Sequence, residues 1–325
     1  MENLLLKVDN LKTYFFTRRG IIKAVDGVSF SLSEGHTLGL VGESGCGKTV
    51  TGLSILRLEP KPAGKIVGGS ILFQGEDLVK MSESQIRAIR GGKISIIMQD
   101  PNTSLNPAYT IGNQIMEMLR LHLKLKGKIG LEKMVQSLKS VRIPAPESRA
   151  SNFPHQLSGG MKQRVSGAMA ISCRPSLIIA DEPTTALDVT TQAQYLDLLS
   201  DLQKETGVAM IFITHDLGII ASMCDRVCVM YAGKIVESGT VEEVWNNPCH
   251  PYTKALINSI PKLEQKVGRL YSIEGKVPSL LNLPQGCTFY PRCEQVNEQC
   301  KQEYPLSVDL GNEHIVSCWQ AKDQK

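Results

Sequence analysis

Two glycine-rich segments carry residue types that bind phosphate groups. GESGCGKT covers Gly42–Thr49, and LSGGMKQR covers Leu157–Arg164. The first matches the pattern G-x-x-x-x-G-K-[ST], in which backbone N–H groups and a Lys hold the phosphates of a nucleoside triphosphate. LSGGMKQR looks like a second phosphate site, but only GESGCGKT contains the Lys of a P-loop. We therefore expect two subunits to grip each nucleotide, one giving GESGCGKT and the other LSGGMKQR.

The segment Gly42–Thr49 follows an apolar, strand-like run and precedes a predicted helix, which is the context that a P-loop requires. We expect Lys48 to reach the β- and γ-phosphates and the Thr49 hydroxyl to bind Mg²⁺. The other predicted nucleotide contacts come from the loop and from the residue after it: Gly42, Glu43, Ser44, Gly45, Cys46, Gly47 and Val50.

Two carboxylates end the apolar run Ser176–Glu182. A buried strand there would deliver Asp181 to the Mg²⁺ shell and place Glu182 to orient or deprotonate the attacking water. Such an acidic pair is more often a solvated strand end. The presence of a P-loop in the same chain favours the catalytic interpretation.

Two further strand ends carry polar side chains. Gln99 closes the predicted strand Lys93–Gln99, and its amide could bind Mg²⁺ and sense the γ-phosphate. His215 ends the predicted strand Val208–His215 and could donate a hydrogen bond to a γ-phosphate oxygen. Taken alone, each would be interpreted as a surface residue.

The segment Leu157–Arg164 precedes a helix predicted to begin near Met161. The Ser158 hydroxyl, together with the N–H groups of Gly159 and Gly160 at a helix N-terminus, would make an anion site. The alternative is an ordinary N-capped helix after a tight turn. The whole string LSGGMKQR is much less common than such a cap.

Strands and helices alternate in the elements that must position these residues. Several predicted strands are apolar at consecutive positions, which is typical of strands covered on both faces, so we expect a mostly parallel α/β sheet. Helical spacing replaces the strand pattern after the run that ends at Gln99. It predicts a helical subdomain over about residues 100–170.

Composition restricts the kind of partner. The chain has 325 residues, a net charge of +4 and 42% hydrophobic residues. It has no dense run of Lys and Arg, so nothing demands a nucleic-acid surface. We find no apolar run long enough to span a bilayer and no signal peptide at the start of the sequence, so we expect a cytosolic chain that could dock on a membrane protein.

Taken together, these strings resemble the ATP-binding subunits of ABC transporters across about residues 4–240. Gly42–Thr49 resembles the family's Walker A motif, Gln99 its Q-loop, and Asp181 with Glu182 its Walker B motif. Asp188 resembles the D-loop residue, and His215 the switch histidine. The signature motif, which acts on the partner's nucleotide, is matched by Leu157, Ser158, Gly159, Gly160, Met161 and Gln163.

The resemblance implies an ATPase with a P-loop NTPase core, an N-terminal antiparallel β subdomain, a helical signature subdomain and a small Cys-rich C-terminal extension. Thr49, Gln99 and Asp181 would hold Mg²⁺, and Glu182 with His215 would carry hydrolysis. The family stacks the adenine on an aromatic residue near the N-terminus. The best match is Phe15, and Tyr14 is the alternative.

HPYTKAL (His250–Leu256) and GCTFYPRC (Gly286–Cys293) resemble the ATPases of dipeptide and oligopeptide importers, whose relatives include nickel importers. The resemblance implies an ATPase domain over 1–248, an extension over 249–325, and a peripheral position at the cytoplasmic face of the membrane. It implies a second ATPase subunit (usually a paralogue, although a homodimer is possible), two transmembrane permease subunits and, indirectly, an extracytoplasmic peptide-binding protein. Nickel import and a non-transport soluble ATPase remain alternatives.

Four of the nine cysteines gather near the end of the chain. Cys287, Cys293, Cys300 and Cys318 have the spacing C-x5-C-x6-C-x17-C. Irregular spacing on a Pro-rich segment favours a [4Fe–4S] cluster, because zinc sites more often show paired C-x2–4-C knuckles. A zinc site and free or oxidised thiols stay open. We expect the group to stabilise the extension, which has little apolar sequence of its own.

Overall fold

The computed structural model describes residues 3–260 and 272–324, and it divides into two compact units. Unit 1 consists mainly of Lys80–Phe212. Unit 2 consists of Leu4–Leu32, Thr37–Val79 and the residues from Ile213 onward. Residues 261–271, which belong to the predicted extension over 249–325, lie outside the described residues.

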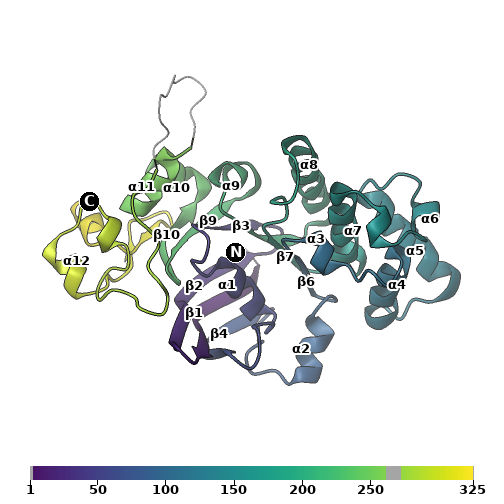
Figure 1. Ribbon diagram of the computed structural model, residues 1–325, viewed down its shortest axis with the longest axis horizontal. Coiled ribbons are helices and arrows are strands. Elements are labelled where there is room, and N and C mark those ends of the chain that lie inside the picture. Colours follow the sequence, from purple (N-terminus) through teal and green to yellow (C-terminus); the bar gives the residue numbers. More distant parts are fainter. Residues whose placement is uncertain (1–2, 261–271, 325) are drawn as a thin grey trace. The chain divides into compact units, whose positions relative to one another are not determined.

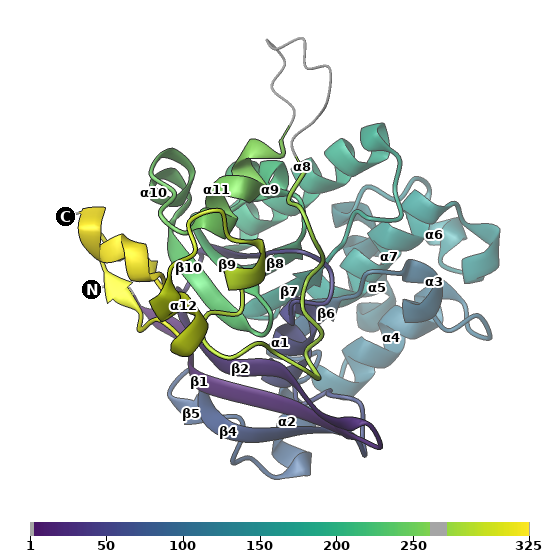
Figure 2. The same ribbon diagram turned by 60° about the vertical axis from the view of Figure 1, so that its left-hand side comes forward.

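A four-stranded antiparallel sheet forms the N-terminal part of unit 2 (Figure 2). Its strands, in the order β2-β1-β4-β5, are Gly20–Ser33, Leu4–Thr17, Gly64–Phe73 and Glu76–Asp77. Buried and exposed side chains alternate along much of β1, with Leu6, Val8 and Leu11 in the core. Such alternation is typical of a sheet with one covered face. The predicted antiparallel β subdomain is confirmed.

Another sheet in unit 2 begins with a parallel pair. β3 (Thr37–Val41), buried at every position, lies parallel to β9 (Arg226–Tyr231). Antiparallel strands then extend this sheet from β9: β10 (Lys234–Thr240), β12 (Ile315–Val316) and β11 (Val308–Asp309). The helices of this part are α1 (Lys48–Ile55), α9 (Leu217–Met223), α10 (Val241–Asn246) and α11 (Pro251–Asn258).

The C-terminal extension packs on the β3–β9 sheet through aromatic residues. The Tyr231 ring on β9 lies 4.7 Å from the Tyr252 ring on α11 and 5.1 Å from the Phe289 ring, in both cases edge to face. These rings share one core cluster with Val41, which directly precedes the P-loop. The extension includes α12 (Glu298–Gln302; Figure 1) and two 3₁₀ turns, Tyr290–Arg292 and Trp319–Gln324. It therefore shares a core cluster with the strands of unit 2.

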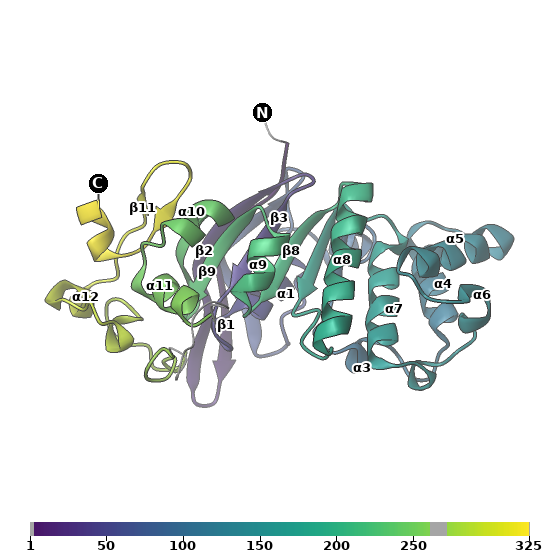
Figure 3. The same ribbon diagram turned by 90° about the horizontal axis from the view of Figure 1, so that it is seen from above.

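Unit 1 combines a parallel strand pair with a group of helices, of which Figure 3 shows α4, α5, α6 and α7 next to one another. β6 (Ile94–Ile97) pairs in parallel with β7 (Leu177–Asp181). The buried strand β8 (Ala209–Thr214) follows α8, and its last residues, from Ile213, belong to unit 2. Helices α4, α5 and α7 pack on one another. The helical segments of this unit are α2 (Glu83–Ile89), α3 (Pro101–Ser104), α4 (Ile111–His122), α5 (Gly127–Ser140), α6 (Pro146–Arg149), the 3₁₀ turn Pro154–Gln156, α7 (Gly159–Ser172) and α8 (Val189–Thr206).

Element ends differ from the sequence prediction at two functional positions. β6 ends at Ile97, so Gln99 lies in the turn after the strand, where Asp100 then caps α3. α7 begins at Gly159 and not near Met161, because the Ser158 hydroxyl already accepts the Met161 N–H as an N-cap. Within the described part of the chain, we find no helix long and apolar enough to cross a membrane.

Candidate nucleotide-binding site

The P-loop in unit 2 is shaped by glycines that no other residue could replace without rearrangement. A Cβ on Gly42 (φ 154°) would lie 2.2 Å from the Met230 carbonyl oxygen. A Cβ on Gly47 (φ 107°) would lie 2.2 Å from the Ala24 carbonyl oxygen. The backbone of the loop therefore approaches two other strands at distances that exclude a side chain.

The P-loop Lys is buried within the curve of the loop. Lys48 is 5% exposed, and its Nζ donates hydrogen bonds to the carbonyl oxygens of Gly42 (2.7 Å) and Glu43 (3.1 Å). Cys46 is fully buried, and burial raises the pKa of its thiol. Thr49 and Val50 lie in the first turn of α1, whose N–H groups face the loop end of the helix. A cation at the centre of the loop and a helix N-terminus are the two features that bind phosphate.

Glu43 is held by two residues of the C-terminal extension that the sequence pattern did not predict. Arg292 donates to both carboxylate oxygens, at 2.6 Å from Nη1 and 3.1 Å from Nη2. The hydroxyl of Tyr252 accepts the Glu43 N–H at 2.9 Å. These contacts join residues that are 249 and 209 positions apart, so no local sequence pattern could have revealed them.

The predicted catalytic carboxylates lie at the end of β7 in unit 1. Asp181 is 3% exposed, and Glu182 follows it with a φ of 43°. A non-glycine residue in that region is strained, and such strain often marks functional sites. One oxygen of Glu182 accepts hydrogen bonds from Gln99 Nε2 and from the Thr185 hydroxyl, both at 3.0 Å. The structure thus brings Gln99 and Glu182 together and adds Thr185, which no sequence motif had indicated.

The signature segment forms the start of α7. Ser158 is the N-cap, and a Cβ on Gly160 would lie 2.7 Å from a methyl carbon of Thr191. Thr191 in turn donates its backbone N–H (2.9 Å) and its hydroxyl (2.7 Å) to Asp188, the predicted D-loop residue, which caps α8. Gln163 is 1% exposed, and neither of its amide atoms has a hydrogen-bond partner among the described residues. Leu157, Gly159 and Met161 complete the segment.

Three other predicted residues lie in unit 2. His215 follows β8 immediately, and Asp216 caps the next helix, α9. Tyr14 donates its hydroxyl to Asp26 at 2.6 Å, which ties it into the N-terminal sheet. The Phe15 ring lies beside Gly64, where a Cβ would be 3.1 Å from a ring carbon. That Phe15 stacks on the adenine, with Tyr14 as the alternative, stays a prediction.

The four C-terminal thiols influence one another electrostatically. Burial raises the pKa of Cys287 to about 11, and the charges of Cys300, Cys318 and Cys293 add to this rise. The backbone joins two of these residues directly, because the Cys287 N–H donates to the Cys300 carbonyl oxygen at 2.8 Å. The four cysteines therefore lie in one region of the extension, close enough to affect one another's pKa.

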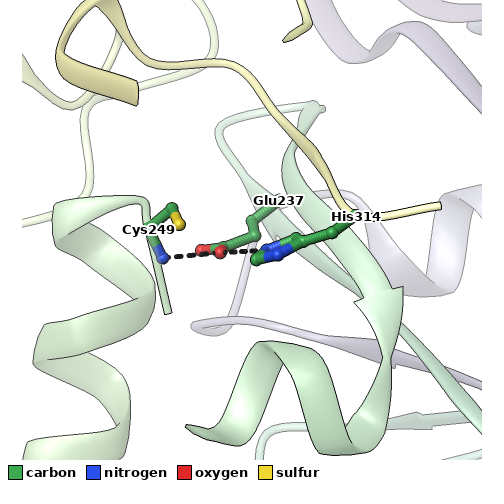
Figure 4. A group of neighbouring side chains, drawn as sticks. All are labelled: Glu237, Cys249 and His314. Carbon is green, nitrogen blue, oxygen red and sulfur yellow. Dashed lines mark hydrogen bonds and ion pairs between the residues drawn. The ribbon is translucent and has the colours of Figure 1, made fainter. Parts of the chain in front are cut away.

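A different group brings possible metal ligands within 4.8 Å of one another: Glu237, Cys249 and His314 (Figure 4). Glu237 is fully buried. Its oxygens accept the N–H groups of Cys249 (2.7 Å) and His250 (2.9 Å), and His314 Nε2 lies 2.8 Å from one of them. With these contacts the carboxylate already has partners for both oxygens. We interpret this group as the anchor that joins β10, the start of α11 and the C-terminal segment.

Comparisons with known protein families match two parts of the chain. Residues 25–185 match the ABC transporter family, and residues 236–300 match the C-terminal region of oligopeptide/dipeptide transporters. Among solved structures, a dimeric ATP-binding cassette bound to ADP and Pi is 26% identical, with a TM-score of 0.65 over 73% of this chain and 98% of that one. The fold class is confirmed.

Curated relatives match the chain over almost its whole length. A probable peptide ABC transporter ATP-binding protein of Sinorhizobium fredii is 48% identical over 99% of this chain and 96% of the relative. The dipeptide transport ATP-binding protein of Bacillus subtilis is 47% identical, over 98% of this chain and 95% of the relative. The oligopeptide transport ATP-binding protein of Haemophilus influenzae is 45% identical over 99% of both chains. This chain therefore belongs to the family of ATP-binding subunits of peptide ABC transporters.

Proposed function

We propose that this chain hydrolyses ATP and energises the import of dipeptides or oligopeptides through a membrane permease. The observation that carries the proposal is the presence, in one chain, of a complete set of ATPase motifs and of a C-terminal region that matches oligopeptide/dipeptide transporters. The relatives named for peptide transport match both parts together. A division into an ATPase domain (1–248) and an extension (249–325) is part of the proposal.

The nucleotide is held by residues of this chain and of a second ATPase subunit. Lys48 binds its phosphates, and Phe15 stacks on the adenine. Thr49, Gln99 and Asp181 carry the oxygen donors that Mg²⁺ prefers, and Mg²⁺ held by them would neutralise phosphate charge. Asp181 is almost fully buried at a strand end. The partner supplies its signature segment, from Leu157 to Gln163. The dimeric cassette bound to ADP and Pi supports this arrangement by analogy.

Hydrolysis needs a base that is held in place. Glu182 accepts the proton of the attacking water, and the hydrogen bonds from Gln99 and Thr185 fix the orientation of its carboxylate. His215 donates a hydrogen bond to the γ-phosphate. Because Gln99 contacts Glu182 directly, a residue that senses the γ-phosphate also restrains the base. Loss of the γ-phosphate then changes the contacts that keep two subunits together.

The helical part of unit 1 offers a surface for the permease. A groove of about 740 Å³ lies along α4 and is lined by both polar and apolar side chains. Tyr109 and Leu121 on this groove are 55% and 56% exposed, so both can contact a partner. The residues that line the groove begin at Asn106, a few positions after Gln99. We place the docking of one of the two transmembrane permease subunits here. The chain would then lie at the cytoplasmic face of the membrane, with a peptide-binding protein on the other side.

The four C-terminal thiols suit a [4Fe–4S] cluster. A single zinc ion would require thiolate sulfurs about 3.8 Å apart, since Zn–S bonds are about 2.3 Å long in a tetrahedron. The group of ligands found within 4.8 Å among the described residues includes none of these four cysteines. The buried hydroxyl of Tyr304, which is coupled electrostatically to Cys287 and Cys318, has no hydrogen-bond partner among the described residues. The four cysteines would hold the cluster, and the cluster would stabilise the extension.

Co-expression with the neighbouring gene products tests the function. The chain is purified together with two permease-like chains and a second ATPase. ATP hydrolysis by this complex is then measured in vesicles with three forms of the binding protein: empty, loaded with peptide and loaded with nickel. We expect stimulation by the peptide-loaded protein. If only the nickel-loaded binding protein stimulates ATP hydrolysis, the complex imports nickel. Failure to associate with membrane subunits would favour an ATPase without a transport role. The composition of the purified complex also distinguishes a paralogous partner from a second copy of this chain.

A further inference from the structure

The P-loop carries an acidic side chain at its second position, next to the place where the most highly charged part of the substrate binds. Glu43 follows Gly42, and its side chain is 30% exposed. A carboxylate close to a triphosphate repels it, and this repulsion is strong where water is scarce. A loop built to bind phosphate therefore needs a cation that compensates Glu43.

Arg292 is that cation. Its side chain is 3% exposed, and it forms a bidentate ion pair with Glu43. Such fork-to-fork pairs fix geometry as well as charge. Arg292 also donates to the carbonyl oxygens of Glu274 (2.9 Å) and Ile273 (3.3 Å) and contacts the Tyr231 hydroxyl at 3.4 Å. Its guanidinium is thus oriented by the extension and by Tyr231.

Another contact fixes the backbone of the same residue. The Tyr252 hydroxyl accepts the Glu43 N–H, and Tyr252 is fully buried. Tyr252 stands at the start of α11, where Pro251 occupies the first turn and His250 Nδ1 accepts the Tyr252 N–H at 3.0 Å. The HPY residues of the extension therefore form a fixed support that contributes one hydrogen bond to the P-loop.

We propose that the C-terminal extension is a positioning element for the phosphate-binding loop, in which Arg292 neutralises and orients Glu43 while Tyr252 holds its backbone. Arg292 and Tyr252 are positioning residues, because they act through Glu43. The extension thereby sets the affinity of the P-loop for MgATP, in addition to completing the fold. This inference rests on the proposed function only in that the P-loop binds ATP.

Removing the two charges singly and together tests this role. MgATP binding to the full-length chain is measured by titration calorimetry for Arg292→Met, Glu43→Gln and the double variant. Arg292→Met leaves Glu43 uncompensated, and we expect the dissociation constant to rise roughly tenfold. Glu43→Gln removes the repulsion while the cation remains, and we expect binding to tighten about threefold. The double variant should bind MgATP almost as tightly as the unmodified protein, because it lacks both charges.

Two further measurements separate positioning from a general loss of stability. The loss in Arg292→Met should shrink as salt concentration rises, since salt screens the repulsion. Arg292→Lys keeps the charge without the bidentate geometry and should restore part of the affinity. Tyr252→Phe removes the backbone contact alone and should weaken binding without a change in salt dependence.

A purely structural Arg292 would behave differently. If Arg292 only attaches the extension, Arg292→Met will lower the unfolding temperature but leave the dissociation constant for MgATP unchanged in the folded fraction, and the inference is then wrong. Failure of Glu43→Gln to rescue Arg292→Met would also reject the electrostatic role. Because binding is measured without permease or peptide, a negative result in the transport assay leaves this test intact.

Discussion

Gln99 donates a hydrogen bond from Nε2 to the Glu182 carboxylate at 3.0 Å, although the two residues are 83 positions apart. Glu182 holds its backbone in the left-handed region, with a φ of 43°, at the end of a buried strand. The Thr185 hydroxyl reaches the same carboxylate oxygen. The base of the proposed reaction is therefore restrained by its backbone, by a side-chain amide and by a hydroxyl, all within unit 1.

Replacing Gln99 by Leu tests whether this amide positions the base. Leu has a similar size but cannot donate a hydrogen bond, so Glu182 loses one of the two hydrogen bonds that orient its carboxylate. We expect ATP turnover to fall roughly tenfold or more while MgATP binding changes less. Steady-state ATPase assays and calorimetry measure the two quantities. Gln136→Leu, on α5, is the matched control, and equal turnover in both variants would reject the role of Gln99.

Two P-loop glycines should differ in their tolerance of Ala. A methyl group on Gly42 would lie 2.2 Å from a backbone carbonyl oxygen, whereas one on Gly45 would meet no atom within 4 Å. Gly45→Ala carries only the conformational cost of φ 81°, about 1–2 kcal/mol. Gly42→Ala should lower the free energy of unfolding by at least about 3 kcal/mol. Urea denaturation compares them, and equal losses would contradict the loop geometry.

Acid should weaken the support of the P-loop through His250. Burial lowers its pKa from the ordinary 6.5 to about 4, an effect that Glu237 opposes and Lys254 increases. The native side chain stays neutral between these values, while the unfolded chain takes up a proton below about pH 6.5. The free energy of unfolding should therefore fall as pH drops from about 6.5 to 4, by up to about 3 kcal/mol.

His250→Asn isolates this contribution. Asn keeps an acceptor for the Tyr252 N–H but does not titrate in this range. Denaturation of both proteins across the pH range gives the difference in slope, in which the contributions of all other groups cancel. A wild-type curve that runs parallel to that of His250→Asn would show that His250 does not carry the effect.

The proposed iron–sulfur cluster at the four C-terminal cysteines can be tested by measuring the metal content of the protein. Protein purified under anaerobic conditions should contain about four iron and four acid-labile sulfide per chain. Cys300→Ser removes a buried member of the group and should abolish both, whereas Cys173→Ser, in unit 1, should leave them unchanged. Stoichiometric zinc without iron would reject the cluster, and metal-free protein of normal stability would show that the thiols work as free side chains.

Much of the fold could be predicted from sequence because its signals are local. Consecutive apolar residues before Gly42 and Asp181 predict buried strands, and β3 and β7 are indeed buried throughout. The N-cap at Ser158 likewise depends on residues within one turn. Element ends were less predictable. Gln99 lies beyond its strand because the turn after Ile97 is set by the cap of the next helix at Asp100.

The rest depends on contacts between distant parts of the chain. Arg292 and Tyr252 stand in segments that predict only an extension, yet they contact the P-loop through Glu43. Glu237 and His314 meet although 77 positions separate them. The aromatic core around Tyr231 holds Tyr252, and the β10–β12 pairing brings His314 to Glu237. A single sequence contains no periodicity that records such contacts.

The proposed catalytic role of Glu182 is tested most directly by Glu182→Gln. This change preserves the size of the side chain and an oxygen that can accept from Gln99 and Thr185, but the amide cannot take a proton from water. We expect the variant to bind MgATP and to form a stable ATP-bound dimer, which light scattering detects. Its ATP turnover should fall at least about a hundredfold. Glu205→Gln, at the exposed end of α8, serves as the control. Normal turnover in Glu182→Gln would contradict the account, because the proposed reaction then would not depend on its base.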